Sequence, residues 1–260
     1  MNRCISVITP VHPDASDYLA EAYQSLLAQQ LPKNWEWQWV VQQDGCTHEL
    51  ADLLPADERI SYSTGRQGGN GAAICRTLAL SRASGELIKV LDADDTLPAG
   101  ALARDIAILA RDPDIGWTTS RVLDLLPDGS TVEFDLDPPV GPIHRGDVLH
   151  HWLAHDYRAQ VHPATLCVHR ELLLILGGWM ALPASEDTGL LLSLNAISTG
   201  YFIGQVGLLY RKWPKQSTAQ APHSDPIERA ARVQVIEARA RALFNSTFML
   251  TAALEISEHC

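Results

Sequence analysis

Closely spaced cysteines and long apolar runs are both missing from this sequence. The five cysteines stand singly, at Cys4, Cys46, Cys75, Cys167 and Cys260. Because zinc sites and disulfide frameworks need cysteines at short, regular spacings, neither is predicted, and we expect reduced thiols. No apolar segment approaches the ~20 residues of a membrane span, and the first residues lead into a strand-like stretch instead of a signal peptide. We therefore expect a soluble, cytoplasmic protein without membrane insertion.

Positive charge is also scarce. The chain has 20 Lys and Arg against 31 Asp and Glu, which gives a formal net charge of -11. This balance argues against nucleic acid and anionic membranes as partners, so a phosphate-bearing ligand would have to be held by a few local groups. With 260 residues and 46% hydrophobic content, the chain is long enough to bury the core of a single large α/β domain.

Short apolar segments that end in polar residues organise the N-terminal part of the chain. They lie at 5–9, 37–41, 60–62 and 87–91, with helical spacing of apolar residues at 18–27 and 72–83. Strands that alternate with helices in this way predict an open, mostly parallel sheet flanked by helices. Ligands bind such sheets at the carboxyl ends of the strands. Asp44, Arg76, Asp92 and Asp94 are therefore expected to converge there.

The strand expected at 87–91 runs into three carboxylates within four positions, Asp92, Asp94 and Asp95. Such a cluster is costly to desolvate unless a cation or a sugar hydroxyl completes it. Oxygen ligands suit a hard, partly hydrated ion that shares its shell with phosphate, so Mg²⁺ or Mn²⁺ is predicted. The alternative is an acidic turn that caps a helix starting near Pro98.

Several other segments permit two interpretations. A loop with four glycines at 65–71 could cradle phosphate or be a flexible turn. Glu186 and Asp187 come directly before an expected helix at 189–196, where the helix dipole alone would favour acids. Residues 135–160 are predicted to form a loop and a short helix, and four histidines there fit solvated imidazoles better than a metal site: His144, His150, His151 and His155. We further expect helices at 99–111, 171–176 and 226–244, and strands at 117–124, 130–134, 164–168 and 201–210.

Taken together, these motifs resemble those of the family 2 glycosyltransferases, the inverting, nucleotide-sugar-dependent enzymes of GT-A fold. Residues 5–11 (ISVITPV) are similar to the family's first strand and proline turn, and 40–47 (VVQQDGCT) to its nucleotide-base strand. Residues 70–80 (NGAAICRTLAL) are similar to the segment before its metal motif, 85–95 (GELIKVLDADD) to its DxD stretch, and 177–179 (GGW) and 186–187 (ED) to its later motifs. The departures are His12 and Pro13 where Asn-Glu is usual, Gln43 in place of an acid, and Thr77 in place of Asn.

The resemblance, which covers roughly residues 4–215, implies a role for each matching position. The nucleotide sugar would be bound by Thr9, Pro10, Val11, Asp44, Arg76, Asp92 and Ala93, with Asp44 toward the base and Asp92 toward the ribose. Asp94 would bind the metal, joined by His223 from a C-terminal loop, and Arg211 would bind the donor diphosphate. Asp187, with Glu186 beside it, would be the general base, and Gly178 and Trp179 would contact the acceptor.

The implied domain is 1–220, with a nucleotide-sugar-binding half at 1–97, an acceptor-binding half at 98–220 and a C-terminal helical extension at 221–260. The QxxRW motif of the family's processive membrane enzymes is absent. The implied reaction therefore moves one sugar from a nucleoside-diphosphate sugar, a UDP-sugar by family prevalence, to a hydroxyl of a small soluble glycan or natural product. The sequence leaves the particular sugar and the oligomeric state open, a homodimer included.

Other functions stay open at this point. Residues 90–97 (VLDADDTL) also fit the DxDxT motif of haloacid-dehalogenase-type phosphohydrolases, with Asp92 and Asp94 in the active site. Two strands precede this motif, however, and no lysine lies between Lys89 and Lys212 to bind phosphate. A nucleotidyltransferase would share the fold. A non-catalytic nucleotide-sugar-binding protein would keep the donor site without turnover, and donor consumption would distinguish it from an enzyme.

Overall fold

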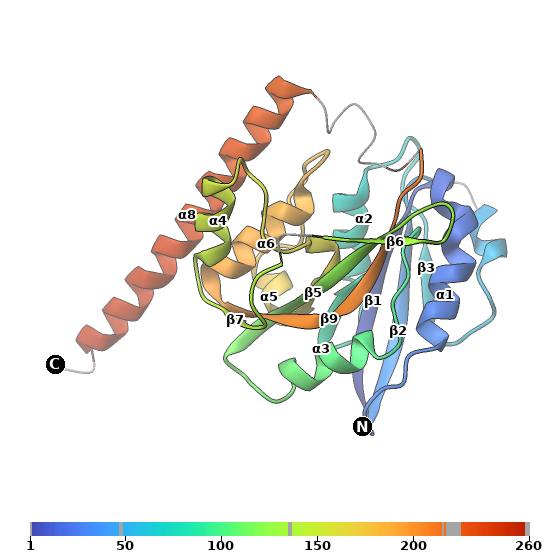
Figure 1. The fold of residues 1–260 in the computed structure, drawn as a ribbon, viewed down its shortest axis with the longest axis horizontal. Helices are drawn as coiled ribbons and strands as arrows, with labels where there is room; N and C mark the ends of the chain where they lie inside the picture. Colours follow the sequence, from blue (N-terminus) through green and yellow to red (C-terminus); the bar gives the residue numbers. More distant parts are fainter. Residues whose placement is uncertain (1, 47–48, 135–136, 215, 217–224, 258–260) are drawn as a thin grey trace.

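The described residues form one nine-stranded sheet with helices on both faces (Figure 1). The structure is a computed structural model that describes residues 2–46, 49–134, 137–214, 216 and 225–257, with side chains for all of these except 49 and 247–257. The strand order is β3-β2-β1-β4-β8-β5-β9-β7, with β6 paired to β5. No helix in these ranges is both long and apolar enough to cross a membrane.

The first four strands of this order are parallel, namely β3 (Ile60–Ser63), β2 (Trp35–Gln43), β1 (Arg3–Val11) and β4 (Leu87–Val90). Strands buried on both faces read as continuous apolar runs. In β1, for example, Val7 and Ile8 are both fully buried but belong to two different core clusters. The parallel sheet predicted from the sequence is confirmed here, and it brings the carboxyl ends of β1, β2 and β4 to one edge.

The second half of the sheet mixes strand directions. The short strand β8 (Cys167–His169) lies antiparallel between β4 and β5 (Ile115–Leu125), and β5 pairs in parallel with β9 (Thr199–Arg211). Two three-residue strands complete the sheet, β6 (Thr131–Glu133) and β7 (Gly141–Ile143). The strand predicted at 164–168 starts later, because Pro163–Thr165 forms a 3-10 turn, η3. Strand β7 could not be predicted from periodicity, because it has only three residues and one of them is a proline.

The helices divide between the two faces of the sheet. One face carries α2 (Ala72–Ala79), α4 (Asp147–Ala154), α5 (Arg170–Ile175), α6 (Glu186–Ile197) and α8 (Pro226–Ser257). The other carries α1 (Leu19–Leu27) and α3 (Ala101–Leu109), and two further 3-10 turns are η1 (Pro13–Tyr18) and η2 (Glu49–Leu53). The helix predicted at 226–244 begins at the predicted proline and continues to Ser257.

The C-terminal helix α8 packs against α6 (Figure 1). Its buried residues Ile236 and Ala240 join the same core cluster as α6. From the other side, the Arg145 guanidinium lies 5.3 Å from the ring centre of Phe244 and bonds to the carbonyl of Ala196, the penultimate residue of α6. The helical extension thus supports α6, whose first turn carries Glu186 and Asp187.

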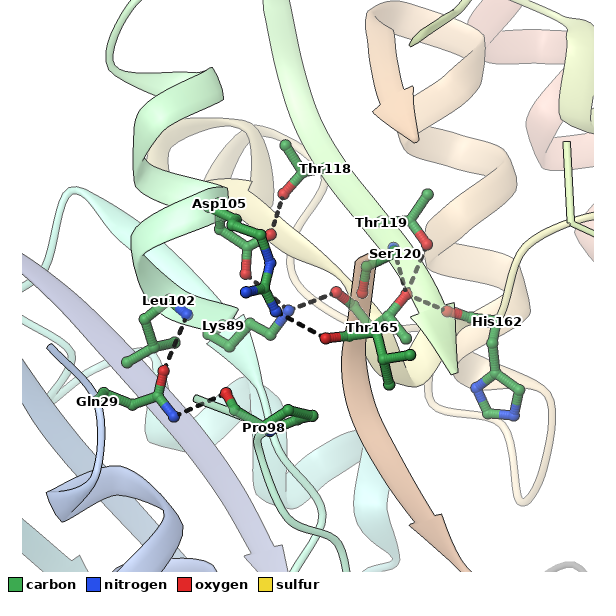
Figure 2. A network of polar contacts seen from close by, with 12 residues as sticks. Gln29, Lys89, Pro98, Leu102, Asp105, Thr118, Thr119, Ser120, His162 and Thr165 are labelled. Carbon is green, nitrogen blue, oxygen red and sulfur yellow. Dashed lines mark hydrogen bonds and ion pairs between the residues drawn. The ribbon is translucent and has the colours of Figure 1, made fainter. Parts of the chain in front are cut away.

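A buried polar network supports the strand that leads into the carboxylate cluster (Figure 2). The Lys89 ammonium lies 2.8 Å from the Asp105 carboxylate and 2.7 Å from the carbonyl of Thr165, and its side chain has no exposed surface. Thr118 donates a 2.7 Å bond to the other Asp105 oxygen. A charge in an apolar core is tolerated only when it is paired in this way. The network therefore ties β4, α3, β5 and η3 together beneath the carboxylate cluster.

Candidate active site

A pocket of about 570 Å³ opens where β1, β2 and β4 end. Segments far apart in the chain form its walls: the ends of these strands, the start of α2, the first turn of α6, η3 and the end of β9. Its polar and aromatic lining comes from His12, Asp44, Arg76, Asp92, Asp94, His162, Ser185, Glu186, Asp187, Thr188, Tyr210 and Trp213. The predicted convergence of Asp44, Arg76, Asp92 and Asp94 is therefore present in the structure.

The loop that carries Asp92 and Asp94 is held against the end of β9. Backbone bonds of 3.2 and 2.9 Å join Thr96 and Leu209, and the Asp95 carboxylate accepts a 2.9 Å bond from the Arg211 amide. Asp95 is buried, and burial together with Asp92 and Asp94 raises its pKa well above the usual range. Asp95 is thus an anchor of the loop, whereas Asp92 and Asp94 face the pocket.

Arg76 links the two acidic motifs of the site. Its guanidinium lies 2.6 Å from the Asp92 carboxylate and 2.6 Å from that of Glu186, and the arginine side chain is only 5% exposed. The planar guanidinium meets the two carboxylates with two separate nitrogens, whereas a lysine would have to meet both with one compact ammonium. Within the described part of the chain, neither Asp94 nor Asp187 forms an ion pair. The bridge therefore leaves one carboxylate of each motif available to a ligand.

Asp187 lies in the first turn of α6 and is half-buried at the pocket wall. Its carboxylate accepts a 2.6 Å bond from the Thr188 amide. Burial raises the pKa of Asp187, while the positive charge of Arg76 opposes the rise. Burial and the adjacent Asp187 likewise raise the pKa of Glu186. Of the two, Asp187 is the carboxylate that is not already bound to Arg76.

At the other end of the pocket, Asp44 organises the glycine-rich loop. Its two carboxylate oxygens accept bonds from the amides of Asn70, at 2.5 Å, and Gly71, at 3.1 Å. Gly69 and Gly71 have φ of 76° and 82°, which glycine adopts without a steric penalty. Pro10 and Val11 line the pocket beside this loop. Thr9 does not, because its hydroxyl accepts a 2.8 Å bond from the buried Trp39 indole.

Several residues predicted to bind ligands have other contacts in the structure. The Arg211 guanidinium bonds to the Asp94 carbonyl at 2.8 Å, pairs with Glu21 and lies over the Tyr18 ring, outside the pocket lining. Trp179 is 5% exposed in the core, and its amide bonds to Thr77 on α2. A side chain on Gly178 would meet Thr77 as well, so this glycine–tryptophan turn fastens α2 instead of lining the pocket. His223 lies outside the described residues.

The sequence interpretation assigned no role to several pocket residues, among them His162, Tyr210 and Trp213. The Trp213 indole donates a 2.5 Å bond to Asp94, and the Tyr210 ring lies 4.9 Å from the His162 ring. One local signal existed, because His162 precedes a proline as His12 does. In both places the imidazole Nδ1 accepts a 3.3 Å bond from the amide two residues on and caps a 3-10 turn.

The site fits a divalent cation that a phosphate ligand helps to hold. Burial and the neighbouring Asp92 raise the pKa of Asp94, against the Trp213 hydrogen bond and the charge of Arg211, and Asp94 forms no ion pair with any described residue. The described residues contain no group of three or more His, Cys, Asp or Glu side chains arranged to hold a metal alone. Mg²⁺ usually binds through one or two carboxylates plus substrate phosphate and water. Asp94, with Asp92 beside it, suits that mode of binding.

The Arg76 bridge provides a first prediction. Replacing Arg76 with Lys keeps the charge but exchanges two separate donor nitrogens, one for each carboxylate, for one compact ammonium with a shorter reach, so we expect the free energy of unfolding to fall by about 1.5–3 kcal/mol. Urea denaturation measures this. Arg3 is the matched control, since it pairs with Glu86 at the same 2.6 Å but is 43% exposed, and Arg3→Lys should cost less than ~1 kcal/mol. Equal losses of unfolding free energy in Arg76→Lys and Arg3→Lys would show that the buried bridge contributes no more to stability than an exposed ion pair does.

Comparison with known proteins agrees with this geometry. Residues 6–129 match the family model described as Glycosyl transferase family 2. A Bacillus subtilis (strain 168) protein described as "Putative teichuronic acid biosynthesis glycosyltransferase TuaG" is 31% identical over 108 residues, which are 40% of this chain and 41% of that protein. The chain thus spans about two fifths of that relative's length.

Solved structures show the same fold. S. aureus TarS 1-349 in complex with UDP-GlcNAc is similar over 95% of this chain and 72% of that chain, with a TM-score of 0.67 and 17% sequence identity. A further structure of S. aureus TarS matches over 95% of this chain and 43% of that one, with a TM-score of 0.61 and 16% identity. At such identities the likeness establishes the fold.

Fold and pocket together define a GT-A-like α/β protein with an acidic site at the carboxyl edge of its sheet. Residues 6–129 match the glycosyl transferase family 2 model, in line with the resemblance of the motifs in this part of the chain. The family match includes Asp44, Arg76, Asp92 and Asp94 but ends before Glu186 and Asp187. The structure adds those two residues to the same pocket.

Proposed function

We propose that this protein is an inverting, metal-dependent glycosyltransferase that moves one sugar from a nucleoside-diphosphate sugar, a UDP-sugar, to an acceptor hydroxyl. The observation that carries the proposal is the Arg76 bridge, which joins the DxD loop to the first turn of α6 with 2.6 Å bonds on each side. Asp94 and Asp187, each next to a residue of this bridge, line the same pocket, which supports roles as a donor-binding carboxylate and a base. The family match favours this interpretation of Asp92 and Asp94 over a phosphohydrolase.

In the proposed reaction, Asp187 acts as the general base. Its carboxylate accepts the proton of the acceptor hydroxyl as the hydroxyl oxygen bonds to the anomeric carbon. The bond between that carbon and the diphosphate oxygen breaks on the opposite face, and the electron pair leaves with the diphosphate. Because there is one displacement, the product has the opposite anomeric configuration from the donor.

The remaining roles follow from position in the pocket. Asp94, with Asp92 beside it, would hold Mg²⁺ or Mn²⁺, which when bound offsets negative charge on the leaving diphosphate. Asp44 and the backbone of its glycine-rich loop would contact the nucleotide, as would Pro10 and Val11. We propose that 1–97 supplies the donor half and 98–220 the acceptor half. The proposed acceptor is a small soluble glycan or natural product, in line with the absence of the QxxRW motif.

Turnover is the direct test. Purified protein is incubated with UDP-sugars, Mn²⁺ and a panel of glycan acceptors, and UDP release and the anomeric configuration of the product are measured. Acceptor-dependent UDP release with inversion supports the proposal. Retention of configuration would contradict the single displacement. Release of phosphate from simple phosphomonoesters without a nucleotide sugar would instead support the phosphohydrolase.

Asp94→Asn tests the metal site separately. At 100 times its dissociation constant, a ligand adds about 2.7 kcal/mol to stability. UDP with Mn²⁺ should therefore raise the melting temperature of the wild type by about 5 °C or more, and it should have little effect on the variant. Asp114→Asn, at an exposed position outside the pocket, should respond as the wild type does. Unchanged Mn²⁺ dependence in Asp94→Asn would remove Asp94 from the metal site.

The melting temperature of the same variant should also depend on pH differently from that of the wild type when no ligand is present. Because the folded protein raises the pKa of Asp94, this group contributes stability at low pH that is lost as pH rises through its folded pKa. Asn cannot ionise and avoids that loss. Asp94→Asn should therefore melt at a higher temperature than the wild type near pH 8, and the difference should shrink as pH falls. A difference that grows at low pH would contradict the assigned direction.

A further inference from the structure

His162 lines the pocket, and its Nε2 atom makes no hydrogen bond with any residue that the structure describes. Its Nδ1 accepts a bond from the Ala164 amide at 3.3 Å, so Nδ1 carries the lone pair. In the neutral imidazole the proton must then reside on Nε2. The side chain is half-buried and lines the pocket. It therefore offers a single N–H donor to whatever occupies this space.

The ring is kept neutral by its surroundings. Burial and the nearby Lys212 lower the pKa of His162 to about 4, against the opposing charges of Asp124 and Asp92. A neutral donor can bond a hydroxyl oxygen without adding charge to the site. The centres of the Phe134 and Tyr210 rings lie 6.1 and 4.9 Å from the centre of the imidazole, and these contacts restrict its orientation.

The backbone under His162 is also fixed. Its carbonyl accepts a 2.7 Å bond from the Thr165 hydroxyl, and that hydroxyl lies 2.5 Å from the hydroxyl of Thr119 and accepts a 3.2 Å bond from the Ser120 amide. The Thr165 carbonyl in turn accepts the buried Lys89 ammonium (Figure 2). An imidazole held by a cap, two rings and a buried ion pair is oriented before any ligand binds, which reduces the entropic cost of its contact.

The position of His162 in the fold puts its N–H group near the part of the pocket where the sugar of a bound nucleotide sugar would lie. The turn that His162 caps, η3, packs against α6, β4 and β9. Tyr210 beside it is three residues before Trp213, whose indole bonds to Asp94. Asp44 follows β2, which β1 and β4 separate from β8 and β9 in the strand order, and its glycine-rich loop lies with it on that side. A diphosphate held near Asp94 with its base toward Asp44 would extend its sugar toward η3.

We propose that the Nε2–H of His162 donates a hydrogen bond to a hydroxyl oxygen of the transferred sugar, and so helps to select the donor. This rests on the proposed function, because it takes a nucleotide sugar as the ligand. His162 is a binding residue in this proposal and takes no part in proton transfer. A neutral hydrogen bond of about 0.5–1.5 kcal/mol corresponds to a two- to twelvefold change in affinity.

Two substitutions distinguish the two functions of this side chain, capping of η3 and hydrogen-bond donation to a ligand. In His162→Asn the amide oxygen can still accept from Ala164, since Asn is a favoured capping residue, but the side chain is too short to donate into the pocket. In His162→Gln the longer side chain brings an N–H group close to the position of Nε2. The melting temperatures of both variants check that each is folded.

The experiment measures dissociation constants for UDP, UDP-GlcNAc and UDP-glucose by calorimetry, with Mn²⁺ present. For whichever UDP-sugar binds the wild type more tightly, the dissociation constant should be at least threefold higher in His162→Asn than in the wild type. The dissociation constant of UDP should be the same in both proteins. His162→Gln should recover most of the lost affinity for the UDP-sugar. Equal weakening of UDP, or unchanged UDP-sugar binding, would overturn the proposal. So would a Gln variant as weak as Asn, or a change confined to the Michaelis constant of the acceptor. Wild-type protein that binds neither UDP nor UDP-sugars would overturn the proposed function itself, before any variant is compared.

Discussion

Replacing Asp187 with Asn is expected to reduce sugar transfer by a factor of about 10²–10⁴, the usual contribution of a general base. The amide keeps the shape of the carboxylate and can still accept the bond from the Thr188 amide. It cannot take the proton of the acceptor hydroxyl. The substitution leaves the contacts of Asp44, Asp92 and Asp94 unchanged. In the presence of Mn²⁺, UDP should therefore raise the melting temperature of the variant by as much as that of the wild type.

The matched control is Glu171→Gln. Glu171 is also an acid in the first turn of a helix, but it is exposed and lies outside the pocket. This variant should transfer sugar at the wild-type rate. If Asp187→Asn retained near-wild-type turnover, the base would have to be another group, and Glu186 would be the next residue to change.

The same assignment predicts the acidic limb of the pH profile. Asp187 must be ionised to act as a base, and burial raises its pKa in the folded protein. The value of kcat/KM should therefore fall as pH is lowered, with an apparent pKa above the ordinary 3.8 of an aspartate. A profile that stays flat down to pH ~4 would contradict an essential carboxylate with a raised pKa.

Replacing Lys89 with Met should produce the largest loss of stability, about 3–5 kcal/mol. The substitution leaves the Asp105 carboxylate buried without its cation, and the Thr165 carbonyl without its donor. For a protein of this size the loss corresponds to a melting temperature lower by ~10 °C. Urea denaturation gives the free energy directly. Lys33→Met, at an exposed position, should change it little.

A double-mutant cycle isolates the ion pair. Asp105→Leu alone should also be strongly destabilising, because it leaves the Lys89 ammonium in the core. The double variant Lys89→Met with Asp105→Leu should lose clearly less than the sum of the two single variants, since no unpaired charge is left. Strictly additive losses would show that the two groups do not depend on each other.

Much of the first half of the fold could be predicted from the sequence because its signals are local. The runs at 5–9, 37–41 and 87–91 are apolar on both faces, and polar residues follow each of them. Parallel strands with this pattern bring Asp44, Asp92 and Asp94 to one edge, where the structure places them. Arg76 was predicted there too, but as a contact of the nucleotide. The structure instead shows it bonded to Asp92 and Glu186.

Contacts between distant segments were decided by the tertiary structure alone. Arg76 and Glu186 are 110 residues apart, and their bond depends on how α6 packs over the end of the sheet. Arg211 carries the charge expected of a diphosphate ligand, yet the closing of β9 onto the carboxylate loop directs its guanidinium to Glu21. Trp179 resembles an acceptor contact in the sequence and is a core residue in the fold.

Short-range periodicity and residue type were enough to predict the resemblance to the family 2 glycosyltransferases, the parallel half of the sheet and the carboxylates at its edge. Which carboxylates Arg76 neutralises, which ones stay available and where His162 lies depended on tertiary contacts, because ion pairing, burial and tautomer are set by neighbours across the fold. The sequence states which side chain stands at each position, but the residues that this side chain contacts depend on the order of the strands in the sheet.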